Sequence, residues 1–210
     1  MTPPSSISSL LFDCDGVLVD SKEASEEAWT EWAGHYGLDA EQVLAGIHGR
    51  RSLETVARLL PEPRRAGATA LIDRLEVETA DRTRPVPGAV ELLAAVPRSA
   101  YAVVTSAPAE LCRARLAAAS LPAPPVLVTS EDVARGKPAP DCYLLGAERL
   151  GVEPAACLVL EDSAAGIAAA RAAGVGFVVG VGPDAHGRGA DVVVPDLTAA
   201  GWQNGRLVLR

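Results

Sequence analysis

Two carboxylates stand one residue apart near the start of the chain, in the segment LLFDCDGVLVDS at residues 10–21. Asp13 and Asp15 follow a short apolar run and precede Gly16, a pattern that also suits an ordinary turn. Like charges at this spacing repel each other unless a cation or water lies between them. The pair is therefore a candidate metal site, with a solvated turn as the alternative.

Three other places in the chain carry polar groups beside apolar runs. Thr105 and Ser106 follow YAVV, Glu161 and Asp162 end the run CLVLED, and Lys137 lies in RGKPAP ahead of a predicted helix. Each place has a plain structural alternative, because hydroxyls and Asp162 could begin helices and a lysine is usually solvated. Lys137 stands out because only two of the 19 basic residues are lysines.

These groups form a coherent set if they meet. Several carboxylates at one place require a hard cation with oxygen ligands, and Mg²⁺ fits that requirement. A lysine, a hydroxyl and backbone N–H groups at turns suit an anion such as phosphate. A cation site facing an anion site, with a carboxylate between them, is the arrangement of a phosphoryl-transfer centre.

The elements that would position this set alternate along most of the chain. Apolar segments at 7–13, 101–105, 125–130, 156–162, 176–182 and 191–196 predict strands, with helical patterns between the later ones. This alternation is typical of a parallel sheet covered on both faces, with ligands bound beyond the carboxyl ends of its strands. Residues 21 to about 82 predict helices only. The expected fold class is α/β, with a Rossmann-like parallel sheet and an all-helical insertion after the first strand.

Composition narrows the function classes. The chain has 210 residues, is 49% hydrophobic and carries a formal net charge of −8. Without a basic run it is a poor partner for nucleic acid or an anionic membrane, and no apolar stretch approaches the ~20 residues of a membrane span. Its four cysteines are far apart in the sequence, which favours reduced thiols and a cytoplasmic protein. We take a monomer as the default.

The four segments resemble, in order, the motifs of the haloacid dehalogenase superfamily in its phosphatase and phosphomutase branch. They are FDCDGVLVDS, VVTS, RGKPAPDCY and LEDSAAGIAAARAAG. The helical insertion falls where that family places its cap. The resemblance implies a core domain of residues 1–17 and 85–210, and a helical cap of residues 18–84.

The resemblance also implies roles for the carboxylates. Asp13 would attack phosphorus and form an aspartyl-phosphate, and Asp15 would be the general acid and base. Mg²⁺ would be held by Asp162 together with Glu161, by the Asp13 carboxylate and by the backbone carbonyl of Asp15. The aspartate two residues after the nucleophile distinguishes phosphatases and phosphomutases from the dehalogenases of the superfamily.

The remaining motif residues would handle the phosphoryl group. By the same resemblance Thr105 would hydrogen-bond it, with Ser106 as a weaker candidate, and Lys137 would neutralise developing charge and keep Asp13 ionised. The intervening Cys14 would point away, into the fold.

Substrate choice is expected to come from the cap. The stretch His48-Gly-Arg-Arg51-Ser resembles a cap segment of glycerol-3-phosphatases and 2-deoxyglucose-6-phosphate phosphatases, which makes His48 and Arg51 candidate substrate residues. A solvated helix face is the alternative for both. The sequence therefore predicts a Mg²⁺-dependent phosphatase of small sugar or polyol phosphates, such as glycerol phosphate.

Two other functions remain open at this point. A β-phosphoglucomutase shares the core and cap type, but it has a lysine in this cap loop and a Ser-Lys-Asn run after the second motif. Here those places hold His48 and Ser106-Ala107-Pro108. A non-catalytic ligand-binding protein would be expected to lack one of the catalytic groups, and none is missing.

Overall fold

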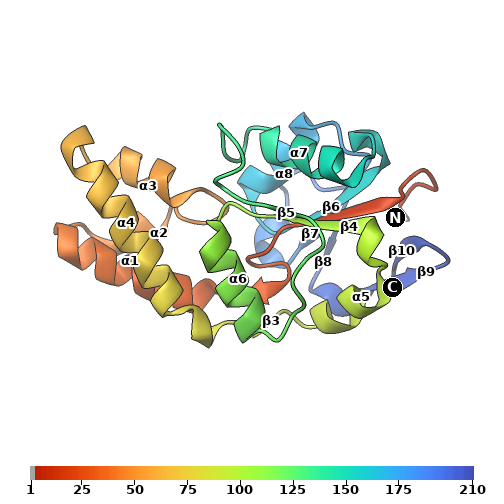
Figure 1. Cartoon of the computed structure of the whole chain (residues 1–210), viewed down its shortest axis with the longest axis horizontal. Coiled ribbons are helices and arrows are strands. Elements are labelled where there is room, and N and C mark those ends of the chain that lie inside the picture. Colours follow the sequence, from red (N-terminus) through yellow and green to blue (C-terminus); the bar gives the residue numbers. More distant parts are fainter. Residues whose placement is uncertain (1–2) are drawn as a thin grey trace.

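The computed structural model describes residues 3–210, and a six-stranded parallel sheet forms its centre (Figure 1). The strand order is β5-β4-β1-β6-β7-β8, so the first strand lies in the middle. The strands are β1 (Ser9–Phe12), β4 (Tyr101–Val104), β5 (Leu127–Val128), β6 (Cys157–Glu161), β7 (Phe177–Val181) and β8 (Val192–Val194). The expected α/β class is confirmed. The strand predicted at 125–130 is shorter than expected.

The sheet separates two hydrophobic cores. All four residues of β1 are buried, and its side chains alternate between the two faces, with Leu10 and Phe12 on one and Leu11 on the other. The first core is covered by α5 (Ala89–Ala95) and α6 (Ala109–Ala118), and the second by α7 (Asp141–Leu150) and α8 (Ala164–Ala172). Strands buried on both faces are near-continuous apolar runs, which is how these segments read in the sequence.

The C-terminal segment closes the first core. A hairpin of β9 (Ala200–Gln203) and β10 (Arg206–Leu209) turns at Asn204-Gly205, where both residues have positive φ. An Asn-Gly pair is the preferred sequence for such a two-residue turn. Short 3₁₀ turns lie nearby and elsewhere in the sheet domain: η2 (Arg98–Ala100), η3 (Pro154–Ala156), η4 (Pro183–Ala185) and η5 (Leu197–Ala199).

A helical insert leaves the sheet after β1. Its two ends pair as short antiparallel strands, β2 (Val19–Asp20) and β3 (Arg84–Pro85). Between them lie α1 (Lys22–Tyr36), α2 (Ala40–Leu44), α3 (Ser52–Leu59), α4 (Glu62–Glu78) and the 3₁₀ turn η1 (Ala80–Arg82). These helices extend to the left of the sheet in Figure 1. The boundaries 18–84 for a separate cap domain stay a prediction.

The helical insert has a hydrophobic core of its own. Trp29, Trp32, Val56 and Ile72 are among its buried members, and the Trp32 indole N–H donates to the Ala68 carbonyl at 2.9 Å. A bound indole N–H is expected where tryptophan is fully buried. The insert can therefore pack its helices together without relying on the sheet.

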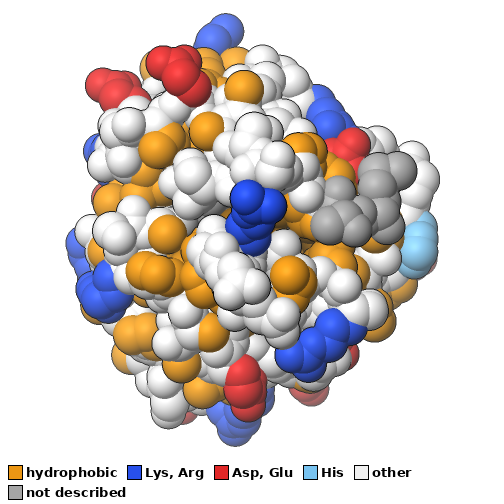
Figure 2. Space-filling view, turned by 90° about the vertical axis from the view of Figure 1, so that its right-hand side faces the viewer, with side chains coloured by type: hydrophobic (Ala, Val, Ile, Leu, Met, Phe, Trp, Pro, Cys, Tyr) orange, Lys and Arg blue, Asp and Glu red, His pale blue; other side chains and the backbone are white. Residues whose placement is uncertain are grey.

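The surface is mixed in character. The face shown in Figure 2, at the end of the molecule away from the helical insert, has small groups of hydrophobic side chains between polar and charged ones. Scattered surface apolar residues of this kind are normal in globular proteins. No helix within residues 3–210 is long and apolar enough to span a membrane.

Gly67, in the interior of α4, offers a test of what stabilises the helical insert. A Cβ at this exposed position would meet nothing within 4 Å. We expect Gly67→Ala to raise the free energy of unfolding by about 0.5–1 kcal/mol, because alanine loses less backbone entropy in a helix.

Urea unfolding followed by circular dichroism measures this change. Gly146 of α7 is the matched control, because a Cβ there would lie 3.0 Å from Val104 and 3.2 Å from Leu11. Equal gains at both positions would contradict the packing described for α7.

Candidate active site

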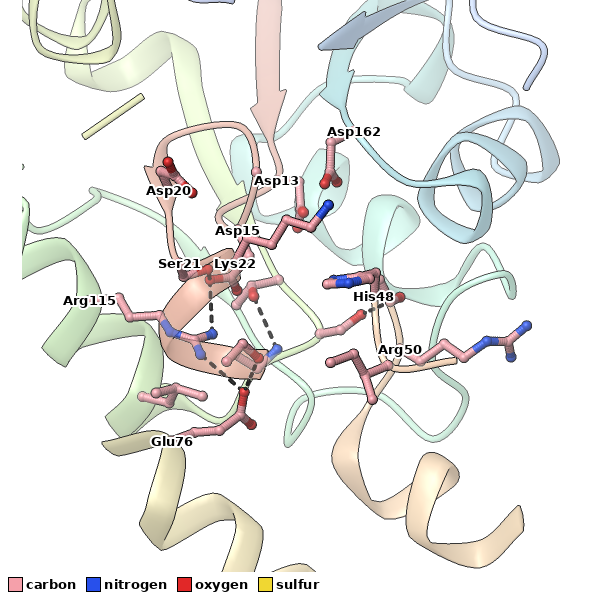
Figure 3. Close-up of a pocket in the computed structure, with 18 of the residues that line it drawn as sticks. Asp13, Asp15, Asp20, Ser21, Lys22, His48, Arg50, Glu76, Arg115 and Asp162 are labelled. Carbon is pink, nitrogen blue, oxygen red and sulfur yellow. Dashed lines mark hydrogen bonds and ion pairs between the residues drawn. The ribbon is translucent and has the colours of Figure 1, made fainter. Parts of the chain in front are cut away.

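The carboxyl ends of the three central strands bring the sequence-predicted groups together. Asp13 follows β1, Thr105 follows the neighbouring β4, and Glu161 ends β6 on the other side. Asp13, Asp15, Thr105, Ser106 and Asp162 line one pocket of about 250 Å³. Residues of the helical insert form the opposite wall of this pocket (Figure 3).

Lys137 is the buried cation of the site. Its Nζ donates to Asp13 Oδ1 at 2.8 Å and to Glu161 Oε1 at 2.6 Å, and its side chain is 1% exposed. Burial lowers the pKa of this ammonium, but the charges of Asp13 and Glu161 outweigh burial and raise the pKa above its usual range. Lys137 therefore stays charged and offsets two buried carboxylates.

Glu161 is fixed on both of its oxygens. Besides Lys137, Oε1 accepts from the Tyr143 hydroxyl at 3.0 Å, and Oε2 accepts from the Ser163 N–H and hydroxyl at 2.8 and 2.9 Å. A Cβ on Gly166 would lie 1.6 Å from Oε1, so α8 approaches this carboxylate closely. Glu161 is thus an anchor for Lys137, which leaves it less free to bind a metal than the resemblance implied.

Asp162 has the opposite character. Its carboxylate accepts no hydrogen bond from residues 3–210. Burial, helped by the charges of Glu161 and Asp13, raises its pKa well above the usual range. Burial likewise raises the pKa of Asp13 to about 7, against the opposing effect of Lys137. The three carboxylates offer oxygen atoms within 4.8 Å of one another, a donor set that fits a hard divalent cation.

The close approach of Asp162 depends on Gly16. This glycine has φ of 78°, and a Cβ there would lie 2.1 Å from Asp162 Oδ2. Any other residue would be strained in the left-handed region and would also displace the carboxylate. Gly16, which follows the two aspartates of the first motif, therefore leaves room for the Asp162 carboxylate of the fourth motif.

Asp15 takes part in a separate charge network. Its Oδ1 accepts from the Ser21 hydroxyl at 2.6 Å and from Arg115 Nη1 at 2.9 Å. The Nη2 of Arg115 donates to Glu76 Oε1 at 3.0 Å, and the Ser25 hydroxyl donates to the same oxygen at 2.7 Å. Figure 3 shows Arg115 between the two carboxylates. This network joins the sheet domain to the helical insert.

The sequence reasoning missed three members of this network, Arg115, Glu76 and Ser25. Arg115 is one of two arginines in α6, and nothing in its spacing marks it; Glu76 lies on α4 among other acidic residues. Ser21 is the N-cap residue of α1, but its hydroxyl makes no capping bond and binds Asp15 instead.

The two hydroxyls after β4 differ in role. Thr105 Oγ1 accepts from the Ala107 N–H at 3.0 Å, which leaves its own hydrogen free to point into the pocket. The Ser106 hydroxyl donates to the Gly49 carbonyl of the helical insert at 3.1 Å. Thr105 is thus available to an anion, whereas Ser106 connects the two walls of the pocket. Cys14 is buried, with its sulfur 3.7 Å from that of Cys112.

The two substrate candidates of the helical insert are placed differently. His48 lines the pocket, and burial, together with Lys22, lowers its pKa. Arg51 does not line it: the guanidinium binds Glu54 and donates to the Val133 and Ala134 carbonyls, each at 3.1 Å. Arg51 immediately precedes α3 in extended backbone, where successive side chains point to opposite sides.

Arg50, not Arg51, is the arginine of this pair that lines the pocket, next to His48. Figure 3 shows its guanidinium extending away from Asp13, Asp15 and Glu76, so Arg50 borders the pocket without pointing at these carboxylates. The sequence pattern identified the arginine pair but not which member lies at the pocket. Arg51 instead latches the helical insert to the loop before Lys137.

Comparisons with known proteins agree with this geometry. A family model described as haloacid dehalogenase-like hydrolase matches residues 7–174. The chain is 45% identical over 169 residues to hexitol phosphatase A of Escherichia coli K12, covering 78% of each chain. It is 31% identical over 183 residues to glycerol-1-phosphate phosphohydrolase 2 of Saccharomyces cerevisiae, covering 80% of this chain and 72% of that relative.

A solved structure shows the same fold. The crystal structure of a hydrolase from Pseudomonas syringae superposes with a TM-score of 0.81 at 25% identity, covering 91% of this chain and 94% of the other. The resemblance stated from the four motifs is confirmed. The roles of the individual site residues stay predictions.

Removing the buried ammonium should be costly. We expect Lys137→Met to lower the free energy of unfolding by about 3–5 kcal/mol in metal-free buffer near neutral pH, because Asp13 and Glu161 lose their buried counter-charge. Without Lys137 the folded-state pKa of Asp13 lies further above its unfolded value, so the deficit should shrink as the pH falls and this carboxyl takes up a proton.

Urea unfolding in EDTA at two pH values measures both effects. Lys22→Met is the control, because that side chain is 60% exposed and its ion pair with Asp184 is 3.7 Å long. A loss of the same size in both variants would show that Lys137 is not structurally special.

The latch formed by Arg51 gives a second expectation. Arg51→Met should speed hydrogen exchange at the start of α3 and in residues 133–137 by about tenfold, because two hydrogen bonds between these segments are lost. Arg58→Met, at an exposed position on the same helix, is the control. Unchanged protection in the Arg51 variant would show that the latch does not hold the insert.

Proposed function

The chain belongs to the haloacid dehalogenase-like hydrolase family, and we propose that it is a metal-dependent phosphatase of small sugar or polyol phosphate monoesters. The observation that carries the proposal is the buried Lys137–Asp13 pair beside the unpaired carboxylate of Asp162 and the free hydroxyl of Thr105. In this arrangement the Lys137 ammonium and the Thr105 hydroxyl would face an anion, and the carboxylates of Asp13 and Asp162 would face a cation. The named activities of the two relatives above support the substrate class.

In this proposal Asp13 is the nucleophile. Lys137 holds Oδ1, and no donor within the described part of the chain reaches Oδ2, which therefore keeps its lone pairs for attack. Attack on phosphorus forms an aspartyl-phosphate and breaks the bond to the ester oxygen. The leaving oxygen takes the proton of Asp15, and Asp15 then accepts a proton from the water that hydrolyses the aspartyl-phosphate.

The transferred group would be held by three further residues. Lys137 would offset its negative charge, and the Thr105 hydroxyl would donate to one of its oxygens; Ser106 would do the same only after releasing its hydrogen bond to Gly49. Thr105 follows β4, and Lys137 reaches Asp13 from the loop before α7, so these donors can converge on a group bound at Asp13. Because the donors are fixed by burial and hydrogen bonds, they need little reorganisation when charge develops.

The residues present fit a divalent cation, for which Mg²⁺ is our proposal. Asp13 and Asp162 would hold it, with the backbone carbonyl of Asp15 and with Glu161 close by. A cation there supplies positive charge that offsets the carboxylates and the phosphoryl oxygens. Burial, with a smaller effect of the neighbouring carboxylates, raises the pKa of Asp13 and of Asp162, and a cation would favour the ionised form of both.

The helical insert would act as the cap that selects substrate. It contributes His48, Arg50 and Glu76 to the pocket, while the phosphoryl-binding groups come from the sheet. The Ser106–Gly49 hydrogen bond and the Arg51 latch hold the two parts together around the cavity. Such a cap would exclude bulk water during the reaction.

The first test is phosphate release from a panel of hexitol, glycerol and hexose phosphates, with Mg²⁺ and again with EDTA. We expect release that needs the metal, and a loss of at least about a thousandfold in Asp13→Asn with the fold intact by circular dichroism. Asp81→Asn, at an exposed position outside the pocket, is the matched control.

Two results would count against the proposal. Full activity in Asp13→Asn would remove the nucleophile assignment. Conversion of β-glucose 1-phosphate to glucose 6-phosphate without net phosphate release would identify a phosphomutase instead.

A further inference from the structure

The pocket wall formed by the helical insert carries a nearly buried carboxylate. Glu76 of α4 lines the pocket and is 7% exposed. Its Oε1 is occupied by Ser25 and Arg115. No donor in the described chain reaches Oε2, and this oxygen is not among the side-chain atoms that are both buried and unpaired. Since Glu76 lines the pocket and its Oε2 is neither fully buried nor hydrogen-bonded in the described chain, this oxygen is an acceptor available to a ligand.

Glu76 is tied to the proposed acid and base by one guanidinium. The two terminal nitrogens of Arg115 hold Asp15 and Glu76 at 2.9 and 3.0 Å, and the Arg115 side chain is 4% exposed. This buried fork fixes the distance between the two carboxylates. A leaving oxygen protonated by Asp15 would thus have Glu76 within reach of its neighbouring substituents.

The charge around Glu76 is negative overall. Arg115 faces two carboxyls, so one negative charge is left without a partner in this network whenever both are ionised. The rim cation Lys22 faces Asp184 instead, and the pair is exposed. A second anionic group on a substrate would meet this uncompensated charge, whereas a hydroxyl would find an acceptor.

We propose that Glu76 selects the leaving group of the reaction. Its Oε2 accepts a hydrogen bond from a hydroxyl near the ester oxygen of an uncharged, polyhydroxylated alcohol, and its charge rejects alcohols that bear a carboxylate or a second phosphate. Trp29 and Ile47, which also line the cavity, provide apolar contact for the carbon chain. This inference rests on the proposed phosphatase activity and names the substrate class more narrowly.

The test compares three substrates in the wild-type protein and in Glu76→Gln, all with Mg²⁺. Glycerol 1-phosphate carries hydroxyls, phosphoglycolate carries a carboxylate, and p-nitrophenyl phosphate carries neither. We expect the ratio of kcat/KM for glycerol 1-phosphate to that for phosphoglycolate to fall by at least about tenfold in the variant, because it loses a charged acceptor and a repulsive charge together.

p-Nitrophenyl phosphate separates specificity from chemistry. An effect that passes through Arg115 to Asp15 changes all three substrates alike, and normalising to this ester removes it. Glu78→Gln is the matched control, because it makes the same change on the same helix at a residue whose side chain is 60% exposed. Its substrate ratio should equal that of the wild type.

The outcomes are distinct. A ratio unchanged in Glu76→Gln, with p-nitrophenyl phosphate still hydrolysed, would overturn the inference and leave the proposed function standing. No hydrolysis of any ester by the wild type would overturn the proposed function. If Glu76→Gln does not fold, Glu76→Asp keeps the charge and withdraws the acceptor: it should turn over glycerol 1-phosphate more slowly and still reject phosphoglycolate. Acceptance of phosphoglycolate by Glu76→Asp would contradict the inference.

Discussion

The ammonium of Lys137 between two buried carboxylates is the interaction on which the rest of the site depends. Asp13 follows β1 and Glu161 ends the adjacent β6 in the middle of the sheet, where burying carboxylates without a counter-charge is strongly destabilising. Tyr143 donates to the same oxygen of Glu161 as Lys137 does, and Ser163 holds the other oxygen, so the lysine is positioned by α7, α8 and the sheet together. One charge thus sets the geometry of three elements.

A second clamp of the same kind lies one layer further out. Arg115 stands between Asp15 and Glu76 as Lys137 stands between Asp13 and Glu161. The inner clamp uses only residues of the sheet domain, whereas the outer one reaches into the helical insert. The choice of cation suits each place: an ammonium is a compact charge among several acceptors, and a guanidinium forks to two.

The sequence predicted the inner part of the site far better than the outer part. Strand ends of a parallel sheet converge whatever the loops do, so Asp13, Thr105 and Asp162 were bound to meet once the alternation was recognised. Arg115 and Glu76 lie inside helices, where only the packing of the insert on α6 decides that they face each other. Arg51 was chosen wrongly for a related reason, since one residue of backbone decides which member of the Arg50–Arg51 pair lies at the pocket and which binds Glu54 and the loop before Lys137.

Gly49 has a consequence for how such a protein diversifies. A Cβ there would lie 2.3 Å from the Ser163 hydroxyl, so the loop of the insert rests directly on the start of α8. Its neighbours His48 and Arg50 line the cavity on either side. Evolution can therefore exchange the side chains that flank this glycine while the contact point stays the same. Substitutions at a few residues of the helical insert can then change the substrate, while the site residues of the sheet domain stay the same.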